Sequence, residues 1–202
     1  MHKPILFFVL AGTAVAPLAH AQHSEHPAMS GMHSPHQGMA MPSMKMGMSG
    51  METLTGLTGK EFNIAFLSQM IAHHQGAVEM AQQALKVAKH AETRQEAHMV
   101  ITDQKKEIAQ MTSWLQKWYG VQPSEKEAER MKADMKPMME RKIENDRMFF
   151  TMMIPHHQSA IEMSRMALKQ SDKAEVKQLA HSIIKAQKAE IVRYKRLLTH
   201  VS

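Results

Sequence analysis

The stretch QMIAHHQGAVEM, from Gln69 to Met80, decides the fold, because the chain repeats it in close copy as MMIPHHQSAIEM, from Met152 to Met163. A shift of 83 residues aligns 66–118 with 149–201 without a gap, and 23 of the 53 aligned positions are identical. Each copy has the period of an amphipathic helix and is followed by a second helical segment. One such hairpin exposes an apolar face, whereas two hairpins bury those faces against each other. The repeat therefore predicts an all-α protein, an up-down four-helix bundle made of two related hairpins.

Capping signals outline the helices. Four segments with capping-box spacing are predicted to open helical regions: TGKE (Thr58–Glu61), TRQE (Thr93–Glu96), SEKE (Ser124–Glu127) and DKAE (Asp172–Glu175). Pro137 is expected to break or bend the start of the third region, and Pro155 to kink the helix that contains it. The bundle domain is predicted to span 58–202, with repeat one at 58–120, a connector at 121–140 and repeat two at 141–202.

The N-terminus has the features of a secretory signal peptide. A short basic start at His2 and Lys3 precedes the apolar run ILFFVLAGTAVAPLA, which is too short to span a bilayer comfortably. Small residues then favour cleavage after Ala21. We therefore predict that residues 1–21 are removed and that the mature protein is periplasmic, without a membrane span. An uncleaved membrane anchor is the alternative.

Residues 22–57 are predicted to form a disordered tail rich in methionine and histidine. Residues 22–51 contain eight Met and four His among Gly, Pro and Ser, and no large aliphatic residue that could build a core. A flexible chain with thioethers two residues apart can wrap several of them around one ion, so we predict that the tail captures metal ions, and a plain linker is the alternative. The predicted tail ligands are His23, His26, Met29, Met32, His33, His36, Met39, Met41, Met44, Met46, Met48 and Met51.

The composition restricts both the chemistry and the partners. The 202 residues include 22 Met and 14 His but no Cys, so disulfides and thiolate metal sites are excluded. A thioether has no proton to lose and prefers soft ions such as Cu(I). The formal charge is +6, but Lys and Arg alternate with Glu along the helices and aromatic residues make up 5%. A nucleic-acid partner is therefore not expected.

A helical projection places the paired histidines on the apolar stripe of their helices. In the first copy, His73 and His74 straddle the stripe, and Met70 lies one turn before them. Met80 lies two turns from His73, so it more readily serves a neighbouring site or the core. The predicted metal ligands are Met70, His73, His74, Met80, Met153, His156, His157 and Met163.

The second helix of each hairpin carries polar residues on or beside its apolar stripe. They are Gln104 and Glu107 in the first unit and Gln187 and Glu190 in the second. A glutamine carbonyl that accepts from one imidazole N–H would orient the ring and leave its other nitrogen free for a metal, so we predict a second-shell role for these four residues. The alternative is a purely structural His–Gln network that fixes the pairing of the hairpins.

The residues around each histidine pair indicate the kind of metal. Di-iron bundles place Glu-x-x-His motifs in their core, whereas this chain has Met70 and Met153 at the matching positions. Cu(I) or Ag(I) is therefore favoured over oxygen-activating iron, with Cu(II) at places dominated by histidine. Glu79 and Glu162 project away from the stripe and are expected to be solvated. Four further methionines at helical spacing are expected to be core or lid residues, with a further soft-metal site as the alternative: Met131, Met135, Met138 and Met139.

The doubled M-I-x-H-H-Q-x-A-(V/I)-E-M motif, each copy followed by Q-x-x-E-I, resembles a bacterial family catalogued as a domain of unknown function. The resemblance covers about residues 58–200 and implies a ferritin-like four-helix fold that binds copper or silver in the periplasm. The motif methionines and histidines are the ligand candidates that it carries over. Pro155 departs from the first copy, where Ala72 stands, so the two sites need not be equivalent.

The sequence therefore predicts a non-enzymatic periplasmic protein that sequesters or relays copper for copper tolerance. Silver would act as a surrogate ion, and copper efflux or chaperone proteins are the expected protein partners. One alternative is a metal-dependent oxidase on a ferritin-like scaffold, and a haem b bundle is another. A structural or interaction module that binds no metal is the last alternative.

Overall fold

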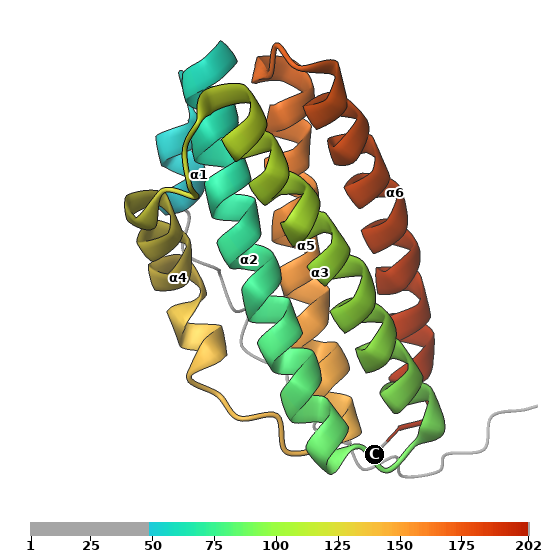
Figure 1. Cartoon of the computed structure of the whole chain (residues 1–202). Coiled ribbons are helices and arrows are strands. Elements are labelled where there is room, and N and C mark those ends of the chain that lie inside the picture. The colour runs from blue at the N-terminus through green and yellow to red at the C-terminus, as the bar shows by residue number, and fades with distance from the viewer. Residues whose placement is uncertain (1–48, 202) are drawn as a thin grey trace, which may run out of the picture. The chain divides into compact units, whose positions relative to one another are not determined.

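The structure is a computed structural model that describes residues 49–201, and within this range its regular structure is entirely helical. The predicted signal peptide and residues 22–48 of the predicted tail lie outside the described residues. The helices, labelled in Figure 1, are α1 (Ser49–Leu54), α2 (Gly59–Val87), α3 (Ala91–Tyr119), α4 (Glu125–Met139), α5 (Asp146–Gln170) and α6 (Ala174–Leu197). Each of them is either too short or too polar to cross a bilayer.

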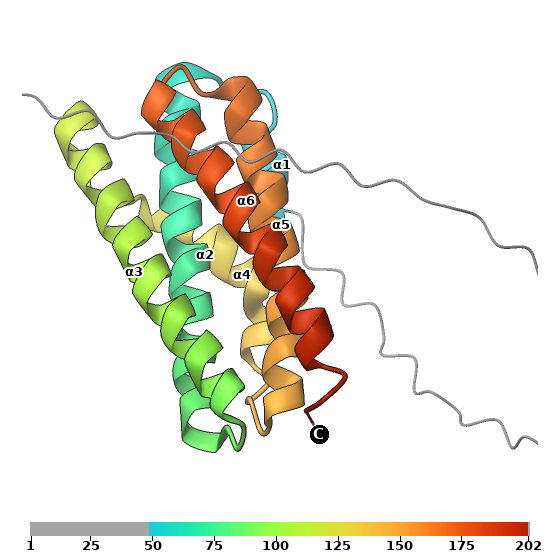
Figure 2. The same cartoon turned by 90° about the vertical axis from the view of Figure 1, so that its right-hand side faces the viewer.

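Two helical hairpins form the body of the fold, which confirms the predicted all-α architecture. Helix α2 packs against α3, α5 packs against α6, and α2 and α5 join the hairpins (Figures 1 and 2). Hydrogen bonds show that α2 and α5 are antiparallel. At one end, the Lys89 backbone N–H donates to Asp146 over 3.0 Å, and at the other end the Ser171 hydroxyl donates to Asn63 over 2.6 Å.

Helix α4 forms the start of the predicted third helical region, which the structure divides into the two helices α4 and α5. It fills most of the connector 121–140 and packs along α2, on a different side of α2 from α3 (Figures 1 and 2). Pro137 does not break this helix, since α4 continues past it to Met139. Pro137 lies in the last turn of α4. Helix α5 likewise runs as one helix across Pro155.

Helical structure is present before the predicted tail boundary at residue 57. Helix α1 packs against α4 and α2, and the Gly50 backbone N–H donates to the Asp134 carboxylate over 2.6 Å. Met51, which the sequence predicts as a tail ligand, lies in α1 and packs against the hydrophobic core. The sequence-based reading missed α1 because two glycines and several small residues flank its few apolar positions.

The predicted capping boxes are only partly confirmed. Ser124 caps α4, since its hydroxyl accepts from the Glu127 backbone N–H. Thr58 precedes α2 without a side-chain capping bond. The box at Thr93 is wrong, because α3 already begins at Ala91, and α6 begins at Ala174 rather than after Asp172.

A capping residue that the sequence-based reading missed gives a first testable prediction. The Asn145 side chain precedes α5 and accepts from the Met148 backbone N–H over 2.8 Å. Asn145→Ala removes this acceptor from an exposed helix end, so we expect the free energy of unfolding to fall by about 1 kcal/mol. Chemical denaturation measures the change, and Asn145→Asp, which keeps an acceptor, is the control. A loss of stability equal in the two variants would contradict the capping role.

Candidate metal centre

The four histidines that are predicted as ligands in the bundle, His73, His74, His156 and His157, meet in the middle of the bundle, where α2 crosses α5. All four side chains are fully buried, at 0% exposure. The rings of His73 and His156, which occupy matching positions in the two repeats, lie 3.8 Å apart between centroids. The rings of His74 and His157 lie beside them, 6.2 and 6.3 Å from their sequence neighbours. We call these four residues the histidine layer.

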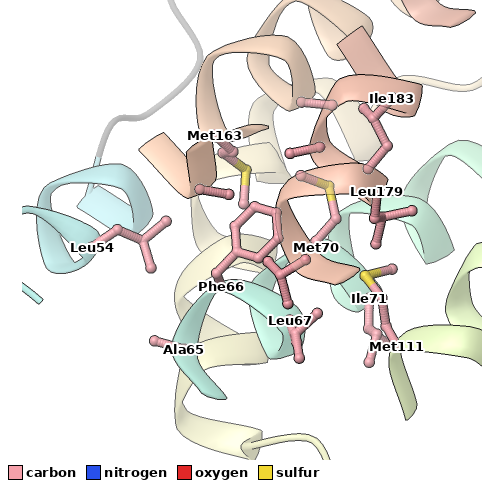
Figure 3. Close-up of a cluster of buried hydrophobic side chains, with 14 of the residues drawn as sticks. Leu54, Ala65, Phe66, Leu67, Met70, Ile71, Met111, Met163, Leu179 and Ile183 are labelled. Carbon is pink, nitrogen blue, oxygen red and sulfur yellow. The ribbon is translucent and has the colours of Figure 1, made fainter. Parts of the chain in front are cut away.

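The antiparallel pairing of α2 and α5 places methionines on both sides of the histidine layer. Met70 and Met163 belong to one hydrophobic cluster, shown in Figure 3, together with Phe66 and Met111. Met80 and Met153 belong to the other cluster. Each predicted methionine is at most 1% exposed. All eight predicted bundle ligands are therefore core residues, and each histidine pair has thioethers in the clusters above and below it.

Each outer histidine pairs with a glutamate of the neighbouring helix. His74 Nε2 lies 2.6 Å from Glu107 Oε2, and His157 Nε2 lies 2.7 Å from Glu190 Oε2, although the second contact departs from ideal hydrogen-bond direction. Because a carboxylate only accepts, the ring nitrogen that faces it carries the proton. The lone pair of each ring therefore lies on Nδ1.

The predicted role of the glutamines as histidine partners is wrong. Gln104 and Gln187 are 5% and 4% exposed, and their Oε1 atoms have no hydrogen-bond partner within the described part of the chain. Glu107, one turn further along α3, accepts the hydrogen bond from His74 instead, since an ionised carboxylate is a stronger acceptor than an amide, and Glu190 of α6 contacts His157 at the matching place. Two buried acceptors are thus left open beside the histidine layer.

The inner histidines contact the backbone and a hydroxyl. His156 Nε2 donates to the His73 carbonyl oxygen over 3.1 Å, which again leaves the lone pair on Nδ1. His73 Nε2 lies 2.6 Å from the Ser159 hydroxyl. The Nδ1 atoms of His74, His156 and His157, like that of His73, are buried without a hydrogen-bond partner among residues 49–201.

Burial keeps the inner histidines neutral. It lowers the pKa of His73 and of His156 well below the usual value of 6.5, and the positive charge that neighbouring histidines would carry lowers each pKa further. A neutral imidazole has one lone pair available for a metal, whereas an imidazolium has none. At neutral pH these rings are therefore in the form that can bind a metal ion.

Within residues 49–201, no three His, Asp or Glu side chains gather in an arrangement that could hold a metal ion. An ion bound in the bundle would therefore draw on two nitrogens or on methionine sulfur. Such a donor set suits a soft monovalent ion better than zinc or iron.

A groove leads from the surface toward the histidine layer. It has a volume of about 430 Å³ and lies between α3 and α6, on the face that Figure 2 shows. Gln104, Glu107, Gln187 and Glu190 line it. The glutamate side chains are 23% and 12% exposed, although the histidines behind them are fully buried. The groove thus gives solvent access to the partners of the outer histidines.

Sequence reasoning missed two residues of the site. Ser159, the hydroxyl partner of His73, replaces Gly76 of the first repeat, so this difference between the copies was a usable signal. The Tyr194 ring lies 5.5 Å from the His157 ring, and its buried hydroxyl has no hydrogen-bond partner in the described region. Its counterpart in the first repeat is Met111, and no motif distinguishes the tyrosine from an ordinary core aromatic.

Solved structures of similar sequence share this fold. The Cu(II)-bound form of CopM is 30% identical, with a TM-score of 0.60 over 71% of this chain and 97% of CopM. A silver-soaked form of CopM is 33% identical, with a TM-score of 0.58 over 68% and 94% of the two chains. A DUF305 fragment from Deinococcus radiodurans is 27% identical, with a TM-score of 0.55 over 68% and 95%. A search of curated proteins gave no significant match.

The sequence model of one family matches the chain twice. Its description is "Domain of unknown function (DUF305)", and the matches cover residues 15–115 and 84–198, which overlap and each contain one copy of the His-His motif. The double match agrees with the internal duplication and with the two hairpins of the structure. The chain therefore belongs to the DUF305 family.

Proposed function

We propose that this protein binds Cu(I), or Ag(I) in its place, in the histidine layer of the bundle, and thereby sequesters or relays copper. The observation that carries the proposal is the set of buried imidazoles whose Nδ1 atoms have no partner. A buried polar atom without a hydrogen bond is unfavourable, so such a cluster requires an explanation. A soft ion would supply the missing partner.

The outer histidines have the arrangement that orients a metal ligand. In His74 the Glu107 carboxylate takes the Nε2–H, which would fix the tautomer and raise the basicity of Nδ1, and in His157 the Glu190 carboxylate lies 2.7 Å from Nε2 at the matching place. The inner pair, His73 and His156, offers two further Nδ1 atoms. The thioethers of Met70, Met80, Met153 and Met163 are the remaining candidate ligands.

Similarity to CopM supports copper and silver as the ions. CopM has been solved in Cu(I)-, Cu(II)- and Ag-bound forms, and this chain covers 94–97% of the CopM chains in those structures. The Cu(I)-bound form is 31% identical to this chain. Cu(I) remains the favoured ion for this chain because thioethers flank the histidines, whereas Cu(II) would bind where nitrogen and oxygen donors dominate.

The N-terminal segment fits a role in the periplasm. The predicted signal peptide at 1–21 would export the chain, and the methionines and histidines of 22–48 would capture ions before the bundle binds them. Copper efflux or chaperone proteins are the partners to which such a protein would pass its ions. Mass spectrometry of the protein isolated from periplasm, with Gln22 at its N-terminus, would support this part of the proposal, and a retained Met1 would contradict it.

Metal titration tests the proposed function directly. The mature chain is titrated calorimetrically with Ag(I) in chloride-free buffer and with Cu(I) under anaerobic conditions. We expect Kd values below about 1 μM for both ions, which corresponds to a favourable binding free energy of more than about 8 kcal/mol. Zn²⁺ is the control ion and is expected to bind more weakly. Affinity weaker than micromolar for both soft ions would rule out a sequestering role.

A further inference from the structure

Helix α4 and α2 enclose a second groove away from the histidine layer. Its volume is about 470 Å³, and its lining includes Gly76 and Glu79 of α2 and Met135 and Met139 of α4. Met135 is 1% exposed and Met139 is partly exposed, so one sulfur lies deep and the other closer to solvent. Figure 1 shows α4 beside α2, with no helix of the second hairpin between them.

The sulfurs of the two methionines converge on Gly76. A Cβ placed on this glycine would lie 3.3 Å from Met135 Sδ and 3.4 Å from Met139 Sδ. The two sulfurs can therefore be no farther apart than the sum of these distances, and they border one small volume. A hydrogen in place of a side chain at residue 76 is what gives them this room.

The two repeats differ at the position of Gly76, and the hairpin fold that they share does not require this difference. The counterpart of Gly76 in the second repeat is Ser159, which contacts His73 instead. A glycine in a helix interior lowers helix stability relative to alanine. The first repeat thus has glycine, a poor helix former, at the position where the sulfurs of α4 approach. The second repeat has no helix like α4 packed against it and has serine at this position.

The rim of the groove carries more acidic than basic side chains. Glu79, Glu129 and Glu140 line it together with Lys132 and Lys136. Lys132 pairs with Glu129 over 2.8 Å, and Lys136 pairs with Glu140 over 3.6 Å. The carboxylate of Glu79 is left as the excess charge, although it also interacts with Lys132 over a longer range. A cation that enters the groove would meet this carboxylate near the two thioethers.

We propose that Met135 and Met139, packed over Gly76, form a second soft-cation site that binds Ag(I) or Cu(I) separately from the histidine layer. Two neutral thioethers with a carboxylate nearby suit a monovalent soft ion and not Mg²⁺, Ca²⁺ or Zn²⁺. The site is nearer the surface than the histidine layer and uses none of its residues. Either site can therefore fail without the other.

Methyl NMR of the full mature chain, labelled at the methionine methyl groups and titrated with Ag(I) in chloride-free buffer, tests the site. The signals of Met135 and Met139 are expected to shift together. In Met139→Leu, a change of similar volume, the response of Met135 should be lost, whereas Met138→Leu, a buried change outside the groove lining, should leave it intact. Methyl signals of Met135 and Met139 that stay fixed while other methionines saturate would overturn the proposal.

A second variant separates metal binding from packing. Gly76→Ala adds a methyl group against both sulfurs but improves the helix, so we expect at least a tenfold weaker Ag(I) response at Met135 and Met139, with an unchanged or higher Tm. An unchanged response would contradict the site. The signals of Met70 and Met163 report on the histidine layer in the same titration, so failure of the proposed function can be told apart from failure of this site.

Discussion

Replacement of His74 and His157 by glutamine in the same chain is expected to weaken Ag(I) binding at the histidine layer by at least about 100-fold. Each change removes an Nδ1 lone pair that no protein group uses. The glutamine amide can still donate to Glu107 or Glu190, so the contact between helices is kept. Loss of groups that merely orient a metal ligand already lowers affinity 10- to 100-fold, so loss of two ligands should have at least that effect.

The measurement is a competition titration with a chain that begins at Ser49 and carries Met139→Leu, so that neither the tail ligands at 23–48 nor the proposed site on α4 contributes. The matched control is His98→Gln with His181→Gln, an exposed pair that also occupies equivalent positions of the two repeats. This control should bind as the unaltered chain does. If the His74 and His157 variant loses stability but keeps its affinity, the histidines serve to hold the hairpins together, as the structural alternative requires.

Acid is expected to destabilise the metal-free fold through His73 and His156. Burial lowers the pKa of both groups in the folded state, whereas in the unfolded chain they titrate near 6.5. The unfolded state therefore binds more protons below pH 6.5, and stability falls as the pH decreases. Each group contributes up to about 1.4 kcal/mol per pH unit, so the pair should lower the free energy of unfolding by about 2 kcal/mol between pH 6 and pH 5.

Urea denaturation at a series of pH values, on metal-free protein, tests this dependence. The variant His73→Gln with His156→Gln should show a flatter profile over the same range. Asp146 does not interfere: burial opposes its ionisation, but hydrogen bonds from the backbone N–H groups of Lys89 and His90 lower its pKa to about 2. Its contribution to stability is present above its usual pKa of 3.8 and is lost only toward pH 2. Equal stability of the unaltered chain at pH 6 and pH 5 would contradict the assignment.

The sequence was most informative where one pattern occurs twice. The repeat alone predicted both hairpins, and the helical projection correctly placed His73 and His74 on the buried stripe. The helical region that opens at Ser124 follows from the sequence, but its separation as α4 does not, because the role of α4 depends on Met135 packing against Gly76. That contact joins segments far apart in the chain, and no local spacing encodes it.

Within the site, sequence reasoning included Glu107 among the residues that support the histidines but assigned the hydrogen bond to Gln104. Gln104 lies on the apolar stripe and was therefore expected to accept the imidazole proton, whereas Glu107 at the edge of the stripe does so. The stripe identifies which face of a helix is buried, but not how far a longer side chain bends inward. Which side chain accepts the hydrogen bond from His74 also depends on the strength of each acceptor, and the structure is needed to show which acceptor reaches the ring.

The central claim is that a soft ion binds Nδ1 of the buried histidines, and nitrogen NMR of the ¹⁵N-histidine-labelled chain tests it most directly. On addition of Ag(I), the Nδ1 signals of His74 and His157 should shift and show coupling to silver, while their Nε2 signals keep the protons that face Glu107 and Glu190. Nδ1 signals that do not change at saturating Ag(I), or silver coupling at Nε2 instead, would contradict the account.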